Sequence, residues 1–122
     1  MKIMIVDDNR KIRDVIKSVL FEQKADILEC ENAKSAIENY DRFRPDWVLM
    51  DIEMDGMDGI AAAKAIVKAD TDAKVVIVTN YDEPHFRFAA RAAGAVAFVN
   101  KENLSELNEI INAGRGAGIL RS

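Results

Sequence analysis

Hydrophobic and polar positions repeat one arrangement five times along the chain: a short apolar run, then a segment with apolar residues three and four positions apart. The apolar runs lie at residues 2–6, 25–30, 46–50, 73–78 and 95–99. Short runs that are apolar throughout are typical of strands buried on both faces of a sheet. Apolar residues at helical spacing, with polar residues between them, are typical of helices that bury one face. The pattern therefore predicts five strands that alternate with five helices.

The helical segments are marked by apolar stripes and, in one segment, by residues typical of helix ends. Pro84 suits the first turn of a helix, and Gly94 suits its C-terminal end. The stripes of the other four segments predict these buried positions: Ile12, Val15, Ile16, Val19 and Leu20; Ala33, Ala36, Ile37 and Tyr40; Ile60, Ala63, Ile66 and Val67; Leu104, Leu107, Ile110 and Ile111. Each stripe leaves an exposed polar face, as expected of helices that cover a sheet.

Alternating strands and helices predict an α/β fold, in which right-handed crossovers build a parallel sheet with helices on both faces. The run at 25–30 carries Asp26 and Glu29, so we expect it at an edge of the sheet. With 122 residues the chain has the size of one domain. We expect this domain to span residues 1–113, and residues 114–122 to form a frayed tail or the start of a linker, because glycines recur there.

Composition narrows the functional classes without selecting one. The chain is 49% hydrophobic and 31% charged, as globular domains are, and its net charge of −4 argues against direct nucleic acid binding by this domain. It lacks the ~20 consecutive apolar residues of a membrane span and the apolar stretch of a secretion signal. Cys30 is the single cysteine, so no internal disulfide can form, and we expect it in the core. We therefore expect a cytoplasmic protein that does not act at a membrane.

Polar residues of particular kinds follow the predicted strands. Asp7 and Asp8 follow the first strand, Asp51 follows the third, Thr79 ends the fourth, and Lys101 lies just after the fifth. In an open parallel sheet, ligands bind outside the carboxyl ends of the strands. We therefore expect three acids, one hydroxyl and one lysine to meet at one rim of the sheet.

Taken singly, each residue has an ordinary structural explanation: Asp8 as a helix cap, Asp51 as a turn residue, Thr79 as a strand former and Lys101 as a solvated charge. Taken together they do not, because close carboxylates repel by about 4 kcal/mol per pair at an effective dielectric constant of ~20. One lysine is not enough to offset three such charges. A hard divalent cation with oxygen ligands, Mg²⁺ above all, would offset them. Acids, a hydroxyl, a lysine and Mg²⁺ together predict a site for a phosphoryl group.

This arrangement resembles the receiver domain of two-component response regulators, over residues 2 to about 113. Four stretches in order carry the resemblance: "VDD" at 6–8, "LMDIEMDGMDG" at 49–59, "VT" at 78–79 and "GAVAFVNK" at 94–101. The resemblance implies a flavodoxin-like, five-stranded parallel sheet in the order 2-1-3-4-5. It also implies a phosphorylation-activated signalling switch, similar to receivers that precede helix-turn-helix output domains.

By the same resemblance, Asp51 would accept a phosphoryl group from a histidine kinase or a phosphotransfer protein. Mg²⁺ would be held by Asp7, Asp8, Asp51 and the backbone carbonyl of Glu53. Lys101 would pair with the phosphoryl oxygens. Apart from its own phosphorylation and autodephosphorylation, such a domain is not expected to be an enzyme.

The resemblance also implies how the phosphoryl group is read. Thr79 would donate a hydrogen bond to the phosphorylated form only, and Phe98 matches the switch aromatic three residues before the lysine. The fourth helix, fifth strand and fifth helix would form the output face. This face would contact an output domain or partner protein, with transcription as one output, and dimerisation through the fourth and fifth helices remains open.

Several positions depart from the family pattern. Asp55 stands where the family usually has proline, and Glu102 follows the lysine where proline is usual. A cis bond before a non-proline residue costs roughly 2.5–4 kcal/mol, so we expect a trans Lys101–Glu102 bond. After Thr79 the family prefers a small residue, whereas this chain has Asn80 and then Tyr81. We expect these two residues to crowd the phosphoryl pocket and to alter both loading and hydrolysis rates.

Three other functions stay open on the residues alone. A phosphohydrolase of the haloacid dehalogenase type needs a second acid two residues after its nucleophile at the first strand, whereas Glu53 follows Asp51 at the third. A flavodoxin-like cofactor binder needs a Ser, Thr or Gly-rich phosphate loop after the first strand, where this chain has aspartates. A degenerate receiver would bind a partner without phosphorylation. His85 is expected at the surface, and thioethers such as those of Met54 and Met57 are unsuited to Mg²⁺.

Overall fold

The computed structural model describes residues 1–54 and 56–117 and contains a five-stranded parallel sheet. The strands are β1 (Lys2–Val6), β2 (Asp26–Cys30), β3 (Trp47–Met50), β4 (Val75–Thr79) and β5 (Ala97–Asn100). Their order is β2-β1-β3-β4-β5, with every neighbouring pair parallel. The predicted flavodoxin-like α/β fold and strand order are confirmed, and the run with two acids is an edge strand as expected.

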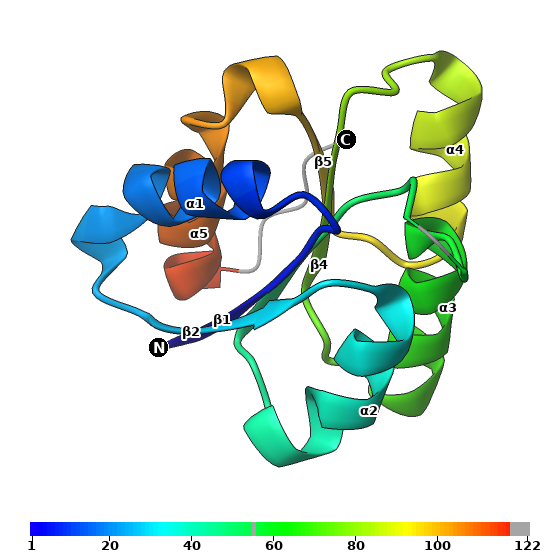
Figure 1. Ribbon diagram of the computed structural model, residues 1–122, viewed down its shortest axis with the longest axis horizontal. Coiled ribbons are helices and arrows are strands. Elements are labelled where there is room, and N and C mark those ends of the chain that lie inside the picture. Colours follow the sequence, from blue (N-terminus) through cyan, green and yellow to red (C-terminus); the bar gives the residue numbers. More distant parts are fainter. Residues whose placement is uncertain (55, 118–122) are drawn as a thin grey trace.

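Helices cover both faces of the sheet (Figure 1). Helices α1 (Arg10–Val19) and α5 (Glu106–Ala117) pack on one face, and α2 (Ala33–Phe43), α3 (Gly59–Ala69) and α4 (Pro84–Ala92) pack on the other. Two short 3₁₀ turns, η1 (Phe21–Gln23) and η2 (Lys101–Asn103), follow α1 and β5. Three layers with a buried central sheet are what the continuous apolar runs require.

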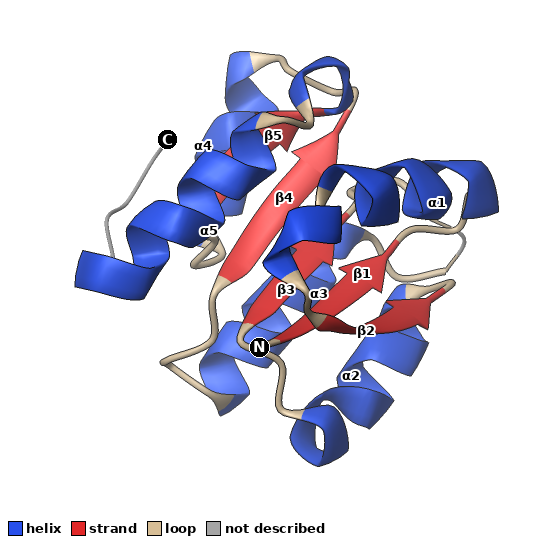
Figure 2. Ribbon diagram, turned by 90° about the vertical axis from the view of Figure 1, so that its left-hand side faces the viewer, coloured by secondary structure: helices blue, strands red, loops and turns tan. Residues whose placement is uncertain are grey.

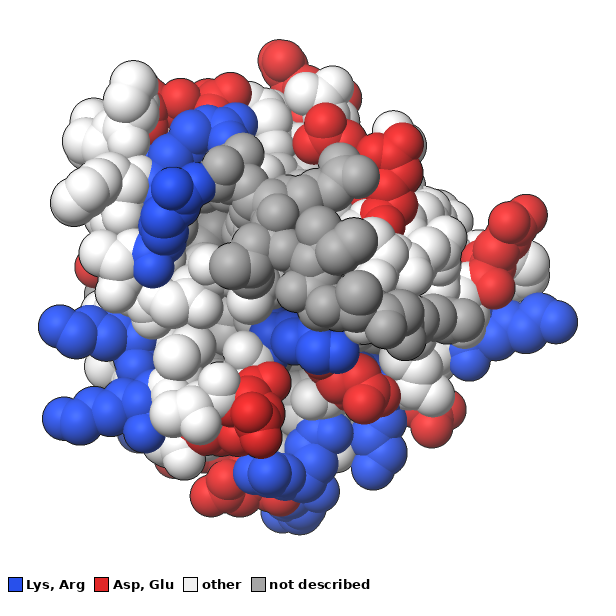
Figure 3. All heavy atoms as spheres, turned by 180° about the vertical axis from the view of Figure 1, so that it is seen from behind, with Lys and Arg blue, Asp and Glu red and all other residues white. Residues whose placement is uncertain are grey.

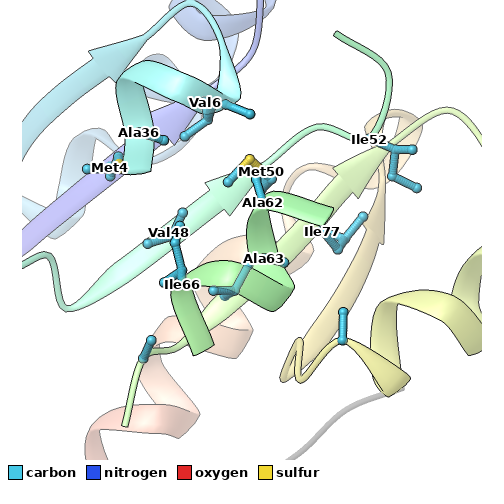
Figure 4. Close-up of a cluster of buried hydrophobic side chains, with 14 of the residues drawn as sticks. Met4, Val6, Ala36, Val48, Met50, Ile52, Ala62, Ala63, Ile66 and Ile77 are labelled. Atoms are coloured by element: carbon cyan, nitrogen blue, oxygen red, sulfur yellow. The ribbon is translucent and has the colours of Figure 1, made fainter. Parts of the chain in front are cut away.

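The sheet divides the core into two clusters, because alternate residues of each strand point to opposite faces. Met4 points to the face of α2 and α3, and Ile3 points to the face of α1 and α5. Figure 4 shows the cluster on the side of α2, α3 and α4, in which Met50 lies beside the small side chain of Ala62. Ala63 of the same helix is also buried in this cluster. Alanines on the buried side of α3 allow this helix to approach the sheet closely.

Helix α1 differs from its predicted stripe in one respect. Val15 is 47% exposed, whereas Arg13 is 7% exposed and lies on the buried side of the helix. Arg13 is buried because it finds hydrogen-bond partners there, described below, and burying a charge requires such partners. The expectation that Val15 belongs to the core is therefore wrong. Ile16 is the buried apolar residue of this helix, and Ile12 and Val19 pack beside it.

The helix ends follow capping rules, but the residue that caps α1 differs from the one considered in the sequence. Asn9, not Asp8, caps α1 and accepts hydrogen bonds from two backbone amides. Asp58 caps α3, which begins at Gly59 as expected. Gly94 follows α4 with a φ of 98°, a conformation that suits glycine.

The C-terminal boundary remains a prediction. Helix α5 runs to Ala117, past the expected domain end at residue 113. The rest of the expected tail, residues 118–122, lies outside the described residues, as does Asp55.

Within the described ranges, no helix is both long and apolar enough to cross a bilayer. On the face shown in Figure 3, basic and acidic side chains are interspersed.

Candidate functional site

The carboxyl ends of the parallel strands bring the predicted polar residues to one rim. The strand arrows in Figure 2 run in one direction, so their ends lie at one edge of the sheet. Asp7 follows β1, Asp51 follows β3, Thr79 ends β4 and Lys101 follows β5. The side chains of Asp7, Asp51 and Thr79 are buried, although they are polar. Burial of this many polar groups has to be compensated by contacts among them or with a ligand.

Three carboxylates form a cluster at this rim. One oxygen each of Asp7, Asp8 and Asp51 lies within 4.8 Å of the others, with Asp7 and Asp51 buried and Asp8 exposed. Clustered carboxylate oxygens, one of them open to water, match the preference of Mg²⁺ for oxygen ligands and retained waters. The donor set therefore fits the ion that the sequence predicted.

Lys101 lies against two of these acids. Its Nζ atom is 2.9 Å from an oxygen of Asp7 and 3.2 Å from an oxygen of Asp51. Burial works to lower the pKa of Lys101, but the hydrogen bond to Asp7 and the charge of Asp51 outweigh it and raise the pKa above the usual value. Lys101 is therefore a fixed positive charge at the centre of the site.

Asp51 is held from several directions. Its Oδ1 atom accepts a hydrogen bond of 2.9 Å from the amide of Ile52. Burial raises the pKa of Asp51, and the nearby charge of Lys101 opposes this rise. The backbone of Gly59 passes so close that a Cβ atom there would lie 1.7 Å from the Asp51 carbonyl oxygen. The glycine thus allows α3 to begin directly against the end of β3.

A cavity of about 500 Å³ opens beside these groups. Its lining consists of Asp8, Asp51, Glu53, Met54, Thr79, Asn80, Tyr81 and Lys101. The Tyr81 hydroxyl donates a hydrogen bond to the Glu53 carboxylate, which joins the loop after β4 to the loop after β3. Asn80 and Tyr81 line the cavity, as their expected crowding of the pocket requires; their effect on reaction rates stays a prediction.

Other predicted residues lie outside the acid cluster. Phe98 is 8% exposed in β5, where the guanidinium of Arg87 lies 4.6 Å from the centre of its ring. His85 is exposed on α4, as expected, and its ring lies 4.2 Å from that of Phe86, centre to centre. The Lys101–Glu102 bond is trans, as predicted.

Sequence reasoning missed two residues that support the acids. The amide of Asn9 donates to Asp7 Oδ1 at 2.9 Å, and the guanidinium of Arg13 donates to the Asp7 carbonyl oxygen at 2.7 Å. The available signal was an arginine between Ile12 and Ile16 of an apolar stripe, together with the acid Glu29 near the end of the edge strand. A buried charge such as that of Arg13 is costly unless it pairs, and Glu29 is the acid within its reach.

Comparisons with known proteins agree with this geometry. The family model of the response regulator receiver domain matches residues 3–112. The chain is 37% identical over 101 residues to the chemotaxis protein CheY of Bacillus subtilis, covering 82% of this chain and 84% of that protein. It is 36% identical over 107 residues to the transcriptional regulatory protein YdfI of Bacillus subtilis, covering 86% of this chain but only 50% of that protein.

A solved structure is similar throughout. The crystal structure of a LuxR-family two-component response regulator from an Aurantimonas species superposes with a TM-score of 0.88 at 32% identity. The match covers 98% of this chain and 86% of that chain. Together these likenesses confirm the resemblance that the sequence motifs indicated.

Proposed function

The chain belongs to the response regulator receiver domain family, and on that premise we propose that it is a signalling switch activated by phosphorylation of Asp51. The observation that carries the proposal is the convergence of Asp7, Asp8, Asp51 and Lys101 at one rim, beside a cavity open to solvent. A histidine kinase or phosphotransfer protein would supply the phosphoryl group. The chain would act as a switch rather than as a turnover enzyme.

Phosphoryl transfer needs an ionised acceptor carboxylate and nearby positive charge. A carboxylate oxygen of Asp51 attacks phosphorus, the phosphorus–nitrogen bond of the donor phosphohistidine breaks, and the imidazole nitrogen keeps the bonding electrons. Lys101 lies 3.2 Å from Asp51 and would pair with the phosphoryl oxygens. Its fixed charge favours the ionised form of a carboxyl group that burial otherwise disfavours.

Mg²⁺ is the cofactor that these residues would hold. Asp7, Asp8, Asp51 and the carbonyl of Glu53 would be its protein ligands. Mg²⁺, when bound, neutralises negative charge on the transferred oxygens. The acid cluster supports this assignment, because its three carboxylates carry more charge than Lys101 alone can balance.

Readout of the phosphoryl group would start from Thr79 and Phe98. Thr79 Oγ1 accepts a hydrogen bond of 3.2 Å from the amide of Tyr81, so a new bond from its hydroxyl to a phosphoryl oxygen would pull on the loop before α4. A contact made only in the phosphorylated form shifts a two-state equilibrium. The output face would comprise α4, β5 and α5 and would contact an output domain or partner, with transcription as one output, since the similar regulator YdfI is about twice as long as the matched region.

Labelling with a small phosphodonor tests the proposal. Wild type, Asp51→Asn and Asp58→Asn are incubated with acetyl phosphate, with and without Mg²⁺, and intact masses are compared. We expect a phosphorylated species only in the presence of Mg²⁺, with labelling of Asp51→Asn reduced to background. Asp58→Asn is the matched control, because Asp58 lies in the same loop and asparagine caps a helix equally well.

Three results would contradict the proposal. Equal labelling of wild type and Asp51→Asn would exclude Asp51 as the acceptor. No labelling of wild type at any Mg²⁺ concentration would favour the degenerate receiver, an alternative that the family departures at Asp55, Asn80 and Glu102 keep open. Continuous release of phosphate over many turnovers would favour a phosphohydrolase.

A further inference from the structure

Arg13 is a buried cation one helical turn beyond the two aspartates that follow β1. Its side chain is 8% exposed, although it lies on a helix whose neighbouring positions are open to water. A guanidinium stays charged at any ordinary pH, so its burial requires acceptors placed for it. The structure supplies two, and neither belongs to α1.

The first acceptor is the backbone of Asp7. Arg13 Nη1 donates to the Asp7 carbonyl oxygen at 2.7 Å, in a buried position. This carbonyl belongs to the peptide unit that joins Asp7 to Asp8. The backbone amide of Asp7 is held as well, because it donates to the Cys30 carbonyl of β2 at 3.1 Å. A planar peptide unit that is fixed at its oxygen also fixes the direction in which the next residue leaves.

The second acceptor is Glu29 of the edge strand β2. Arg13 Nε donates to Glu29 Oε1 at 2.9 Å, and Lys17 Nζ lies 2.9 Å from Glu29 Oε2. Each carboxylate oxygen thus takes one cation. Since the guanidinium is planar, the bond at Nε orients the nitrogen that reaches the Asp7 carbonyl. The edge strand therefore sets the direction of a bond made to the peptide between two candidate metal ligands.

We propose that Arg13, oriented by Glu29, is a positioning residue for the divalent-cation site and holds the Asp7–Asp8 peptide so that both carboxylates face one ion. The inference rests on the proposed function for the identity of the ion, Mg²⁺, and adds to it a residue that touches neither ion nor phosphoryl group. Groups that orient metal ligands typically change metal affinity by about 10–100-fold when removed. The expected change is in the affinity of the unphosphorylated protein for the ion, so it can be measured without phosphorylation.

Calorimetric titration of the unphosphorylated protein with MgCl₂ tests the proposal. Arg13→Met keeps the length of the side chain and removes both donors, and we expect its Kd for Mg²⁺ to rise by about 10–100-fold. Arg13→Lys keeps the charge and a donor, so its Kd should lie between those of wild type and Arg13→Met. Lys17→Met is the matched control: it removes the other cation on Glu29 but leaves the bond to the Asp7 carbonyl, so Mg²⁺ affinity should be unchanged.

Urea unfolding in EDTA is measured on the same variants, so that weaker binding is separated from weaker folding. Wild-type Mg²⁺ affinity in folded Arg13→Met, with only its stability lowered, would overturn the proposal and leave Arg13 a purely structural residue. If Arg13→Met does not fold, Glu29→Leu decides, because leucine removes the acceptor for Arg13 Nε. Glu29→Leu should weaken Mg²⁺ binding while Lys17→Met does not, and equal affinities in these two variants would overturn the proposal.

Failure of the proposed function would look different. Wild type that binds no Mg²⁺ would remove the metal site itself and this inference with it. Labelling of Asp51→Asn to the wild-type level would refute the phosphoacceptor assignment and leave the Mg²⁺ titrations of Arg13→Met unaffected.

Discussion

The candidate site lies between α1 on one side and α4 on the other, and these two helices pack on the sheet in different ways. On the α1 side, the helix begins with the cap Asn9, which accepts from two amides, and it buries Arg13 and Ile16. On the α4 side, the helix begins after Glu83, whose side chain makes no capping bond, and its buried residue is Ala90. The large side chain of Phe88, in the middle of α4, is 76% exposed.

The ion pairs of the two sides also differ, because the pair on the α1 side is less exposed to water than the pair on the α4 side. In the Arg13–Glu29 pair of the α1 side the arginine side chain is buried and the glutamate side chain is 32% exposed, whereas in the Arg87–Asp82 pair of the α4 side the two side chains are 38% and 44% exposed. Exposed pairs contribute at most about 1 kcal/mol. Segments with few buried contacts and exposed polar bonds are the ones that open or move at low cost.

This difference suits the two tasks that we propose for the rim. Carboxylates that bind an ion have to stay in place, and on the α1 side Asn9 and Arg13 both hold Asp7. A segment that reports phosphorylation has to change its position, and the α4 side is joined to the site through Thr79 and the loop that follows it.

The largest expected difference concerns apolar burial. Ile16→Ala should lower the free energy of unfolding by about 2–5 kcal/mol, because Ile16 is buried between α1 and the sheet. Phe88→Ala removes an even larger side chain from the middle of α4, but it should change the free energy of unfolding by less than about 0.5 kcal/mol. Urea unfolding monitored by circular dichroism measures both. Equal destabilisation by the two variants would contradict the contrast between the sides.

A smaller difference concerns the helix caps. Asn9→Ala removes the acceptor for the amides of Lys11 and Ile12 and should cost about 1 kcal/mol of unfolding free energy. Glu83→Ala removes no capping bond and should stay within about 0.5 kcal/mol of wild type. Amide hydrogen exchange should show faster opening of the first turn of α1 in Asn9→Ala only. A destabilised Glu83→Ala would mean that α4 is held more firmly than its contacts indicate.

The smallest effect is a dependence on pH. The hydrogen bond from Lys17, assisted by that from Arg13, holds the pKa of Glu29 below its usual value despite partial burial. Because the folded pKa lies below that of the unfolded chain, ionised Glu29 stabilises the fold above about pH 4.3, and this contribution is lost as pH falls through the folded pKa.

Wild type should therefore exceed Glu29→Gln in unfolding free energy by at most about 1 kcal/mol near neutral pH, and the gap should close in acid. Urea unfolding at a series of pH values measures the gap, and Glu31→Gln, an exposed neighbour, controls for the change in net charge. A gap that is constant with pH would show that the charge of Glu29 does not matter.

Much of the fold could be predicted because its signals are local. Runs such as 75–79 are buried on both faces of the sheet and are apolar nearly throughout, so the strand can be read from consecutive residues. The acids of "ADILEC" indicated the edge position of β2, and Asp58 before Gly59 indicated the start of α3. Strand ends then placed the acids, the hydroxyl and the lysine at one rim, because parallel strands end on the same side.

The details that escaped prediction depend on neighbours that are distant in the sequence. The burial of Arg13 in place of Val15 depends on Glu29, which lies 16 residues away. The contact between Tyr81 and Glu53 spans 28 residues and joins two loops. No periodicity within α1 or within either loop contains this information.

The succession of strands and helices along the chain, the burial of the strands and the residue types at each strand end could all be predicted from the sequence, because they follow from hydrophobic spacing and backbone direction. Three contacts could not be predicted in this way: Asn9 rather than Asp8 caps α1, Lys101 contacts both Asp7 and Asp51, and Arg13 holds the Asp7 carbonyl. These contacts are set by the packing of one element on another, because a side chain is buried with its charge only where a different segment supplies the partner.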